Sequence, residues 1–545
     1  MTIRWAYWKR VLAGAIFGLY IAHLLYFLNP QVDITPGRLA IVTIVYGLIC
    51  GLLFGTALWV LRILRVKLFG KPENGAYRAH GFGYVVLAAF IAAALYWMHL
   101  YVFRIGYLPI GAVRVLSKAT NLITATAFAL LLLWVVERNA DRRRSRVIFL
   151  VGVVLIAISS FFLYQRRDSY RTEKQSVVVA DVGTVAGQRP IIVVAIRNLP
   201  YDWILTLSGE GSLPFFDQAR SRGYFTRLEP FPATDQQALW ASIATGKLPF
   251  RHGVTGRFAY RTSLNSRDPA ERFLILPSGV GFRIWGLIPP VDRIAPQLPS
   301  GDVLPFWTLF ERVGLHATVI DWPSAGKQQR PLPMVAPRAL QRFNGAGRAR
   351  DRIVRGLTAD LSTAVAIRAA ASNRDLTLVV GALNGFEEAQ RAIHIFTNDL
   401  PPRSTMKGEV LRAYTEQIDA TLASIARQFP DHLMVVVAPS GPVAPALATT
   451  PYAMLRDWIS NEDPGADDGF VLISGSGIAH PQKPSPAAPE DVVPTLLYAA
   501  GLPIGRDMDG RVLTDAFTDE LLRRNALSLV QTYEAKQLVV RRGGA

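Results

Sequence analysis

The residues best placed for chemistry stand where short apolar runs end. The run Ile191–Ile196 is followed directly by Arg197 and Asn198. A second run is followed by Gly381–Gln390, which contains neither Asp nor His, and a third by Ala438–Gly441, which reads Ala-Pro-Ser-Gly. A guanidinium group donates hydrogen bonds to anions and is permanently charged, so it cannot bind a metal cation. These residue types favour binding of an anion over binding of a metal ion.

Other reactive residue types are scattered along the chain. The single cysteine, Cys50, lies inside an apolar run, so neither a disulfide nor a Cys-based metal site can form within one chain. Glu387 and Glu388 are either metal ligands or, as we favour, part of a solvated helix face. We expect the following histidines to occupy turn, surface or helix positions instead of binding a metal: His252, His316, His394, His432 and His480.

The composition indicates a membrane protein. Of 545 residues, 50% are hydrophobic, and the formal net charge is +18 with a pI near 10.1. This charge fits either the cation-rich cytoplasmic loops of a membrane protein or attraction to anionic lipid and substrate head groups. We find no aromatic-plus-basic stripe, helix-turn-helix or zinc pattern, so we predict that the chain does not bind nucleic acid. The predicted partner is a lipid bilayer.

Five apolar runs near the N-terminus have the length of membrane-spanning helices, about 20 residues each. They are Val11–Leu28, Leu39–Leu61, Phe82–Phe103, Ala119–Val136 and Val147–Tyr164. Cations concentrate before the first run, after the second and after the fourth, whereas the loop Asn29–Gly37 has none. The positive-inside rule then places the N-terminus in the cytoplasm. We predict a multi-pass protein of the inner (cytoplasmic) membrane whose large C-terminal domain is periplasmic or otherwise extracytoplasmic.

From about Val177 the pattern changes to strand-length apolar runs that alternate with helical segments. The predicted strands are Ile191–Ile196, Thr318–Ile320, Leu376–Val380, Leu433–Val437 and Phe470–Ile473. This alternation predicts an α/β domain with a central, mostly parallel sheet. We expect a membrane domain over 1–170, a linker over 171–185, the α/β domain over 186–520 and a C-terminal helix and tail over 521–545. The Arg-rich segment Ser324–Arg355 is predicted to be a surface excursion.

Five segments of the second half carry a recognisable pattern. They are Ile191–Trp203, Leu213–Gly223, Trp240–Gly256, Leu304–Gly326 and Gly469–Leu513. In the last, Asp491 caps a helix, Pro494 stands in its first turn and Gly501 ends it. In this order the segments resemble the alkaline phosphatase superfamily, and most closely its type I phosphodiesterase/nucleotide pyrophosphatase branch. The resemblance implies an alkaline-phosphatase-like fold with its active site at the carboxyl ends of the strands, the usual place in open α/β sheets.

Active members of that family use two divalent metals, usually zinc, held by Asp and His at strand ends, with a Ser or Thr nucleophile. Relative to that pattern, Arg197 replaces a metal-binding Asp and Asn198 replaces the following Gly. Gln236 holds the nucleophile's position, and Thr234, two residues away, is the nearest candidate hydroxyl. The comparison therefore implies that no metal is bound. It makes Arg197, Asn198, Gln236 and Gln237 candidates for an anion-binding pocket.

Two interpretations of Arg197 stay open, because it either binds an anion or is paired with an acidic residue such as Asp202 or Asp321. We predict a membrane-anchored, outward-facing pseudoenzyme without a cofactor that acts in binding or assembly at the cell envelope. Its partner would be another membrane protein or an anionic lipid or glycan. The alternative is a hydrolase or phosphotransferase for phosphodiester or lipid head-group substrates, with two divalent metals such as zinc and Thr234 as nucleophile.

Overall fold

A computed structural model describes two compact units of the chain. The described residues are 7–8, 11–12, 14–15, 18, 36–69, 82–103, 110–138, 140, 142–165, 177–185, 189–231, 236–254, 259–262, 273–274, 291–294, 298, 303–323, 340–395, 399–441 and 468–542. The first unit comprises Met1–Lys174, Phe258–Ile294 and Trp458–Asn461. The second comprises Gln175–Arg257, Ala295–Asp457 and Glu462–Ala545.

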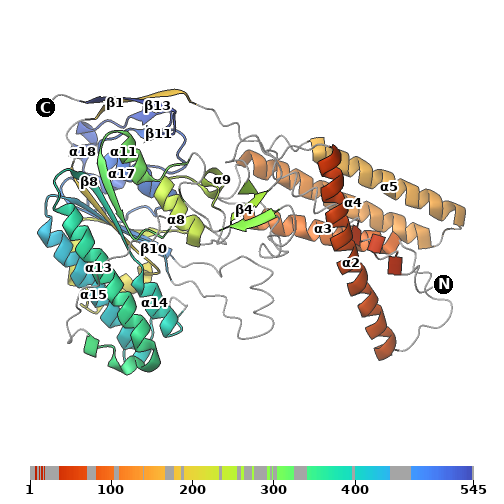
Figure 1. Ribbon diagram of the computed structural model, residues 1–545, viewed down its shortest axis with the longest axis horizontal. Coiled ribbons are helices and arrows are strands. Elements are labelled where there is room, and N and C mark those ends of the chain that lie inside the picture. Colours follow the sequence, from red (N-terminus) through yellow and green to blue (C-terminus); the bar gives the residue numbers. More distant parts are fainter. Residues whose placement is uncertain are drawn as a thin grey trace. The chain divides into compact units, whose positions relative to one another are not determined.

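The first unit consists mainly of long apolar helices (Figure 1). They are α2 (Pro36–Phe69), α3 (Phe82–Phe103), α4 (Ile110–Arg138) and α5 (Arg142–Gln165). By length and composition, three stretches could cross a membrane, namely Ile44–Leu68, Val113–Arg138 and Arg143–Gln165. They correspond to the second, fourth and fifth predicted spans. The third predicted span forms α3, where the apolar stretch is shorter (Val85–Ala94), and most of the first lies outside the described residues.

Small side chains mediate the packing of α3 against α4. Ala88 and Ala92 on α3 and Ala119 on α4 are almost completely buried. Small residues allow helix backbones to approach closely, which is the main packing device of helices in lipid. Leu132 on α4 and Leu150 on α5 are instead 68% and 65% exposed, as side chains that face lipid would be. This unit also contains an antiparallel sheet of β4 (Ala259–Thr262), β5 (Phe273–Leu274) and β6 (Val291–Ile294).

The second unit is built on a six-stranded sheet. In spatial order its strands are β3 (Tyr224–Leu228), β10 (Asp468–Ser474), β9 (Leu433–Ser440), β2 (Ile191–Ile196), β8 (Leu376–Leu383) and β7 (His316–Ile320). β9, β2, β8 and β7 run parallel, and β10 is antiparallel to both of its neighbours. The predicted mostly parallel sheet is confirmed. All five predicted strands are present, whereas β3 was not predicted.

Helices cover both faces of this sheet (Figure 1). One face carries α6 (Tyr201–Gly209), α7 (Pro214–Arg222), α13 (Arg350–Ala371), α14 (Gly385–Ala392) and α15 (Met406–Gln428); the other carries α8 (Gln236–Thr245), α11 (Phe306–Arg312) and α17 (Val492–Ala499). Successive side chains of a strand point to opposite faces. On β2, Ile192 and Val194 therefore join the core under α13, while Ile191 and Val193 join the core under α8. Burial on both faces explains why the central strands are continuously apolar.

Shorter elements complete the unit. They are α9 (Pro249–His252), η3 (Asn344–Ala349), η4 (Pro489–Asp491), η5 (Thr514–Ala516), α18 (Asp519–Arg524), and two parallel pairs, β1 (Val179–Val185) with β13 (Gln537–Arg542) and β11 (Ile504–Gly505) with β12 (Leu529–Val530). The end of α17 agrees with the sequence, because Gly501 follows it with a φ of 69°. That left-handed conformation strongly favours glycine.

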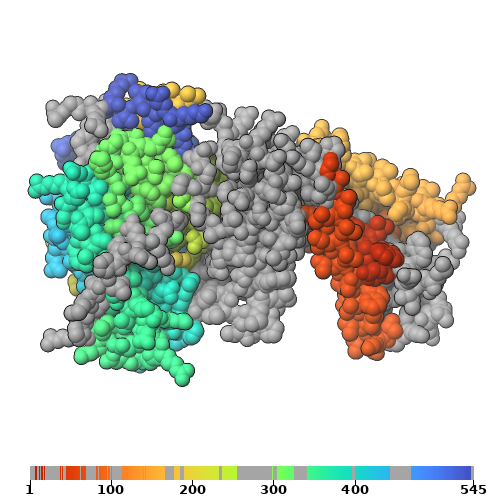
Figure 2. Space-filling view, in the orientation of Figure 1, coloured from red at the N-terminus to blue at the C-terminus, as the bar shows by residue number. Residues whose placement is uncertain are grey.

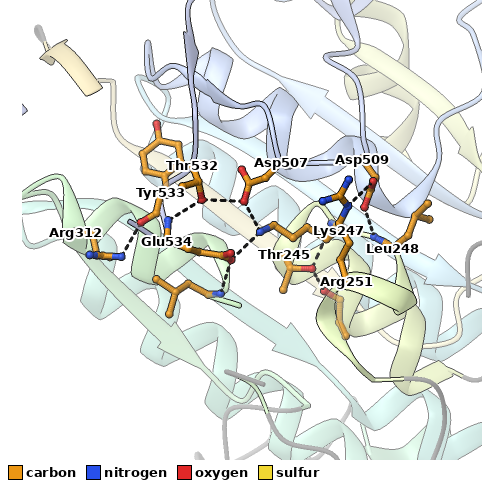
Figure 3. A network of polar contacts seen from close by, with 12 residues as sticks. Thr245, Lys247, Leu248, Arg251, Arg312, Asp507, Asp509, Thr532, Tyr533 and Glu534 are labelled. Carbon is orange, nitrogen blue, oxygen red and sulfur yellow. Dashed lines mark hydrogen bonds and ion pairs between the residues drawn. The ribbon is translucent and has the colours of Figure 1, made fainter. Parts of the chain in front are cut away.

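A buried lysine joins the turn after α8 to the C-terminal segment (Figure 3). Lys247 Nζ lies 2.6 Å from a carboxylate oxygen of Asp507 and 2.8 Å from one of Glu534. Its side chain is 5% exposed, and those of the two acids are 23% and 17% exposed. The Thr532 hydroxyl donates to Asp507 at 2.9 Å. The buried cation thus links the turn after α8 to two carboxylates of the C-terminal segment, and removing it would leave both carboxylates without this partner.

Candidate functional site

The candidate site lies at the edge of the sheet where four parallel strands end. β2 ends at Ile196, so Arg197 and Asn198 lie at this edge, beside Asn384 after β8 and Ser440 at the end of β9. The amide N–H of Arg197 donates to the carbonyl of Leu383 at 3.0 Å, which fixes the two strand ends together. Asn198 has a φ of 64°, a left-handed conformation that asparagine tolerates better than most residues.

Arg197 forms an ion pair with a buried carboxylate of α14. Its Nε lies 2.7 Å from Glu387 Oε2, and the side chains of Arg197 and Glu387 are 18% and 4% exposed. The second oxygen of Glu387 lies 2.6 Å from Arg391, one helical turn later. This arrangement corrects the expected solvated face, since Glu387 is buried while Glu388 is exposed. Of the two interpretations left open for Arg197, an acidic partner is present, and it is Glu387 instead of Asp202 or Asp321 as suggested.

The two acids named in advance have contacts of their own. Asp202 lies 3.3 Å from Arg227, on the exposed side of α6. Asp321 follows β7 and accepts a hydrogen bond from the Thr363 hydroxyl at 2.6 Å. The pairing of Glu387 with Arg197 was not predicted, because the two residues are distant in sequence. The available signal was that α14 begins directly after β8, which places its first turn at the same edge as the end of β2.

Side-chain amides connect Arg197 to α8 and α14. Arg197 Nη2 donates to Gln236 Oε1 at 3.3 Å, and the amide nitrogen of Gln236 donates to Asn198 Oδ1. Gln390 Nε2 donates to the Asn198 backbone carbonyl at 3.0 Å. Three of the four predicted anion-binding residues therefore meet, and the fourth, Gln237, is the next residue of the first turn of α8. Gln390 was not predicted, and its amide gave no signal in the sequence.

A buried aspartate holds α14 in place. Asp360 on α13 accepts hydrogen bonds from the Gly385 amide at 2.8 Å and from the Tyr414 hydroxyl at 2.9 Å. Burial raises the pKa of Asp360 from 3.8 to about 7, although both donors oppose that shift. A Cβ on Gly385 would collide with the carbonyl oxygen of Gly356, so the two helices approach closely only because both residues are glycines. Asp360 and Gly385 thus position Glu387 and Gln390.

His252 has the structural role that the sequence predicted. Its Nδ1 accepts from the Val254 amide at 3.1 Å, and its Nε2 lies 2.9 Å from the Ser242 hydroxyl oxygen. Because Nδ1 is an acceptor, the imidazole is neutral and Nε2–H donates to Ser242. Burial lowers the pKa of His252 to about 3, which agrees with this assignment. The ring holds the turn after α9, and both of its nitrogens are engaged in hydrogen bonds.

The residues at the strand ends do not fit the divalent metals that the family implies. A guanidinium, that of Arg197, follows β2 and cannot bind a cation, and both oxygens of Glu387 are engaged by arginines. Within the described ranges, no group of three or more His, Cys, Asp or Glu side chains could hold a metal ion. Asp468 is paired with Arg227 at 2.6 Å. Thr234, the candidate nucleophile, lies in 232–235, outside the described residues.

Comparison with known proteins agrees with this architecture. The family model for type I phosphodiesterase / nucleotide pyrophosphatase matches residues 198–446. No curated protein sequence matches the chain. Among solved structures, similarity extends to a 2-O GAG sulfatase (14% identity, 60% of this chain and 73% of that chain, TM-score 0.37). It also extends to an inactive variant of murine ectonucleotide pyrophosphatase / phosphodiesterase 5 in complex with AMP (12%, 58% and 96%, TM-score 0.35).

A third structure, alkaline phosphatase PafA, shares 10% identity over 61% of this chain and 100% of its own, with a TM-score of 0.35. The family match begins at Asn198, the left-handed residue of the site, and includes Gln236, Glu387 and Gln390. Residues 198–446 therefore match the type I phosphodiesterase / nucleotide pyrophosphatase family model, within an α/β unit with a mostly parallel central sheet, in a chain that also contains membrane-length apolar helices.

Proposed function

We propose that this phosphodiesterase-like domain is a pseudoenzyme that binds an anionic group without a catalytic metal. The observation that carries the proposal is the Arg197 guanidinium, which lies between Glu387 and Gln236 where the family places a metal-binding Asp. A fixed internal cation neutralises the buried carboxylate, so the pocket is stable without added positive charge. The domain retains its scaffold while its polar centre has changed from metal binding to ion pairing.

The polar centre has the composition of an anion site. Arg197, Glu387 and Arg391 together carry a net charge of +1, and the Arg391 side chain is 45% exposed. The amides of Asn198, Gln236 and Gln237 add neutral hydrogen-bonding groups around this charge. Guanidinium and amide donors suit a phosphate or carboxylate oxygen. The ligand we propose is therefore an anionic head group of a lipid or glycan, or an acidic side chain of another membrane protein.

The predicted topology gives this domain its place in the cell. The last apolar stretch, Arg143–Gln165, precedes the α/β unit, and residues 138–146, which overlap its start, contain five arginines. Cation-rich loops stay in the cytoplasm. We therefore propose that the chain is a multi-pass protein of the inner membrane, that the domain lies on the outer side, and that it acts in binding or assembly at the cell envelope.

The alternative function is catalytic, and the family match over 198–446 favours it because that range includes Thr234. In this alternative the domain hydrolyses or transfers phosphodiester or lipid head groups, Thr234 is the nucleophile and Arg197 clamps the phosphate. Metal ligands would then have to come from residues outside the described ranges.

Activity assays separate the two functions. Purified full-length protein is incubated with bis-nitrophenyl phosphate, with and without added zinc or manganese. The proposal predicts that the wild type hydrolyses no more of this substrate than the Thr234→Ala variant does. The control is Thr206→Ala, since Thr206 is exposed on α6. Hydrolysis by the wild type that Thr234→Ala abolishes and Thr206→Ala retains would establish the enzyme instead.

Anion binding is measured separately by the thermal stability of the full-length protein in inorganic phosphate. We expect phosphate to stabilise the wild type and to have no effect on Gln236→Leu, which removes the amide that contacts Arg197 and Asn198. Gln428→Leu, at the exposed end of α15, serves as the control and should respond like the wild type. Equal responses in all three proteins would place phosphate elsewhere.

A further inference from the structure

The start of α13 carries a row of exposed arginines. Arg352 and Arg355 lie in its first two turns, and Arg348 lies in the η3 turn immediately before it. Spacings of four and three residues bring side chains to one face of a helix. With a rise of 1.5 Å per residue, the row extends over roughly 10 Å. Figure 2 shows this part of the chain, coloured teal-green, at the surface of the α/β unit.

These three arginines have no partner among the described residues. Nearby Arg342 pairs with Glu416, and Arg350 donates to Asn344 at 2.9 Å. No hydrogen bond or ion pair within the described ranges engages the Arg348, Arg352 or Arg355 side chains. Described residues 340–355 contain five arginines, no lysine and a single acid, Asp351, for a net charge of +4. Among the residues that the structure describes, the row is thus a surface with a concentrated positive charge.

The composition of this surface indicates what it binds. All five cations in described residues 340–355 are arginines, whose planar guanidinium groups match pairs of phosphate oxygens. Lysines would serve equally well if the surface only had to provide a diffuse positive potential. Within described residues 340–364 no large apolar side chain is exposed that could insert into a bilayer or stack on a base. We propose that Arg348, Arg352 and Arg355 bind a linear polyanion whose repeated charges are phosphate groups.

This surface is separate from the strand-end pocket, because it uses none of the residues around Arg197. Its test uses full-length protein in nanodiscs of zwitterionic lipid and a labelled short-chain inorganic polyphosphate as the probe. The Arg348→Gln/Arg352→Gln/Arg355→Gln variant should bind roughly tenfold more weakly or worse at low salt, and the slope of log affinity against log salt should fall by about 2. The variant should melt like the wild type, since all three side chains are exposed.

Two further variants keep the test specific. Arg506→Gln/Arg523→Gln/Arg524→Gln removes the same charge from other exposed positions and should bind like the wild type. A triple Arg→Lys variant at the row keeps the charge and should bind more weakly than the wild type, because the paired guanidinium geometry is lost. Equal weakening by the two Gln triples, or undiminished binding by the Lys triple, would overturn the proposal.

A bilayer is the competing partner. Vesicles of anionic phospholipid provide the second arm of the experiment. If the three arginines control binding to these vesicles and have no effect on polyphosphate, the surface recognises a membrane and the proposal fails.

Discussion

Removing the guanidinium of Arg197 is the perturbation with the clearest energetic consequence. Arg197→Met preserves much of the volume of the side chain but removes the 2.7 Å contact with Glu387 and the 3.3 Å hydrogen bond to Gln236. Among the described residues, Glu387, with a side chain that is 4% exposed, would then keep only its contact with Arg391. Because Arg391 is 45% exposed, water screens most of what it can contribute.

The expected loss follows from the burial of the carboxylate. Removing one partner of a buried ion pair typically lowers the free energy of unfolding by about 3–5 kcal/mol. Because the contact with Arg391 remains, we expect Arg197→Met to lower it by about 3 kcal/mol. Adding Glu387→Gln to the Arg197→Met variant removes the unpaired charge, so the double variant should regain more than half of the lost free energy of unfolding. Arg391→Met, which breaks only the exposed contact, should cost about 1 kcal/mol or less.

The measurement is a double-mutant cycle on the free energy of unfolding, made with full-length protein by denaturant titration and tryptophan fluorescence. The two single variants and the Arg197→Met/Glu387→Gln double variant should show a coupling above about 1.5 kcal/mol. Additive effects, within about 0.5 kcal/mol, would show that Arg197 and Glu387 do not interact and would refute the ion-paired pocket.

Two further predictions concern the residues that support the site. Asp360 should make stability decrease as pH rises, because its pKa is raised from 3.8 to about 7 and the folded protein prefers the protonated form. As pH rises from 5 to 8, the stability of Asp360→Asn relative to the wild type should therefore increase by about 2–3 kcal/mol. A difference in the free energy of unfolding that does not change with pH in denaturant titrations would contradict this. Lys247→Met leaves Asp507 and Glu534 facing each other and should cost about 3–5 kcal/mol. Faster hydrogen exchange over 529–542 should accompany that loss, and unchanged exchange there would show that the triad does not secure the C-terminal segment.

The sheet could be predicted because its strands are buried on both faces. β2 and β9 are continuous apolar runs, and their predicted ranges begin at the same residues as the observed strands. β3 was missed because its inward and outward side chains alternate and Arg227 interrupts the pattern. It lies next to β10 at the edge of the six-stranded sheet, where a strand does not need to be buried on both faces.

The candidate site could be predicted in composition but not in its contacts. The type of residue at Arg197 already disfavoured a metal, since guanidinium charge is permanent. The partner of Arg197 could not be identified, because Glu387 and Arg197 are brought together only when β2 and β8 pair in register. Asp360 gave no signal either. Its role depends on the close approach of α13 and α14 at Gly356 and Gly385, which sequence periodicity does not reveal.

The metal content of the purified full-length protein tests the central claim most directly. The claim is that an arginine, ion-paired with Glu387, occupies the position of a metal ligand. Elemental analysis after purification without chelator, and again after dialysis against zinc or manganese, should find far less than one metal ion per chain. One or more tightly held ions per chain, lost when residues at the strand ends are substituted, would contradict the account.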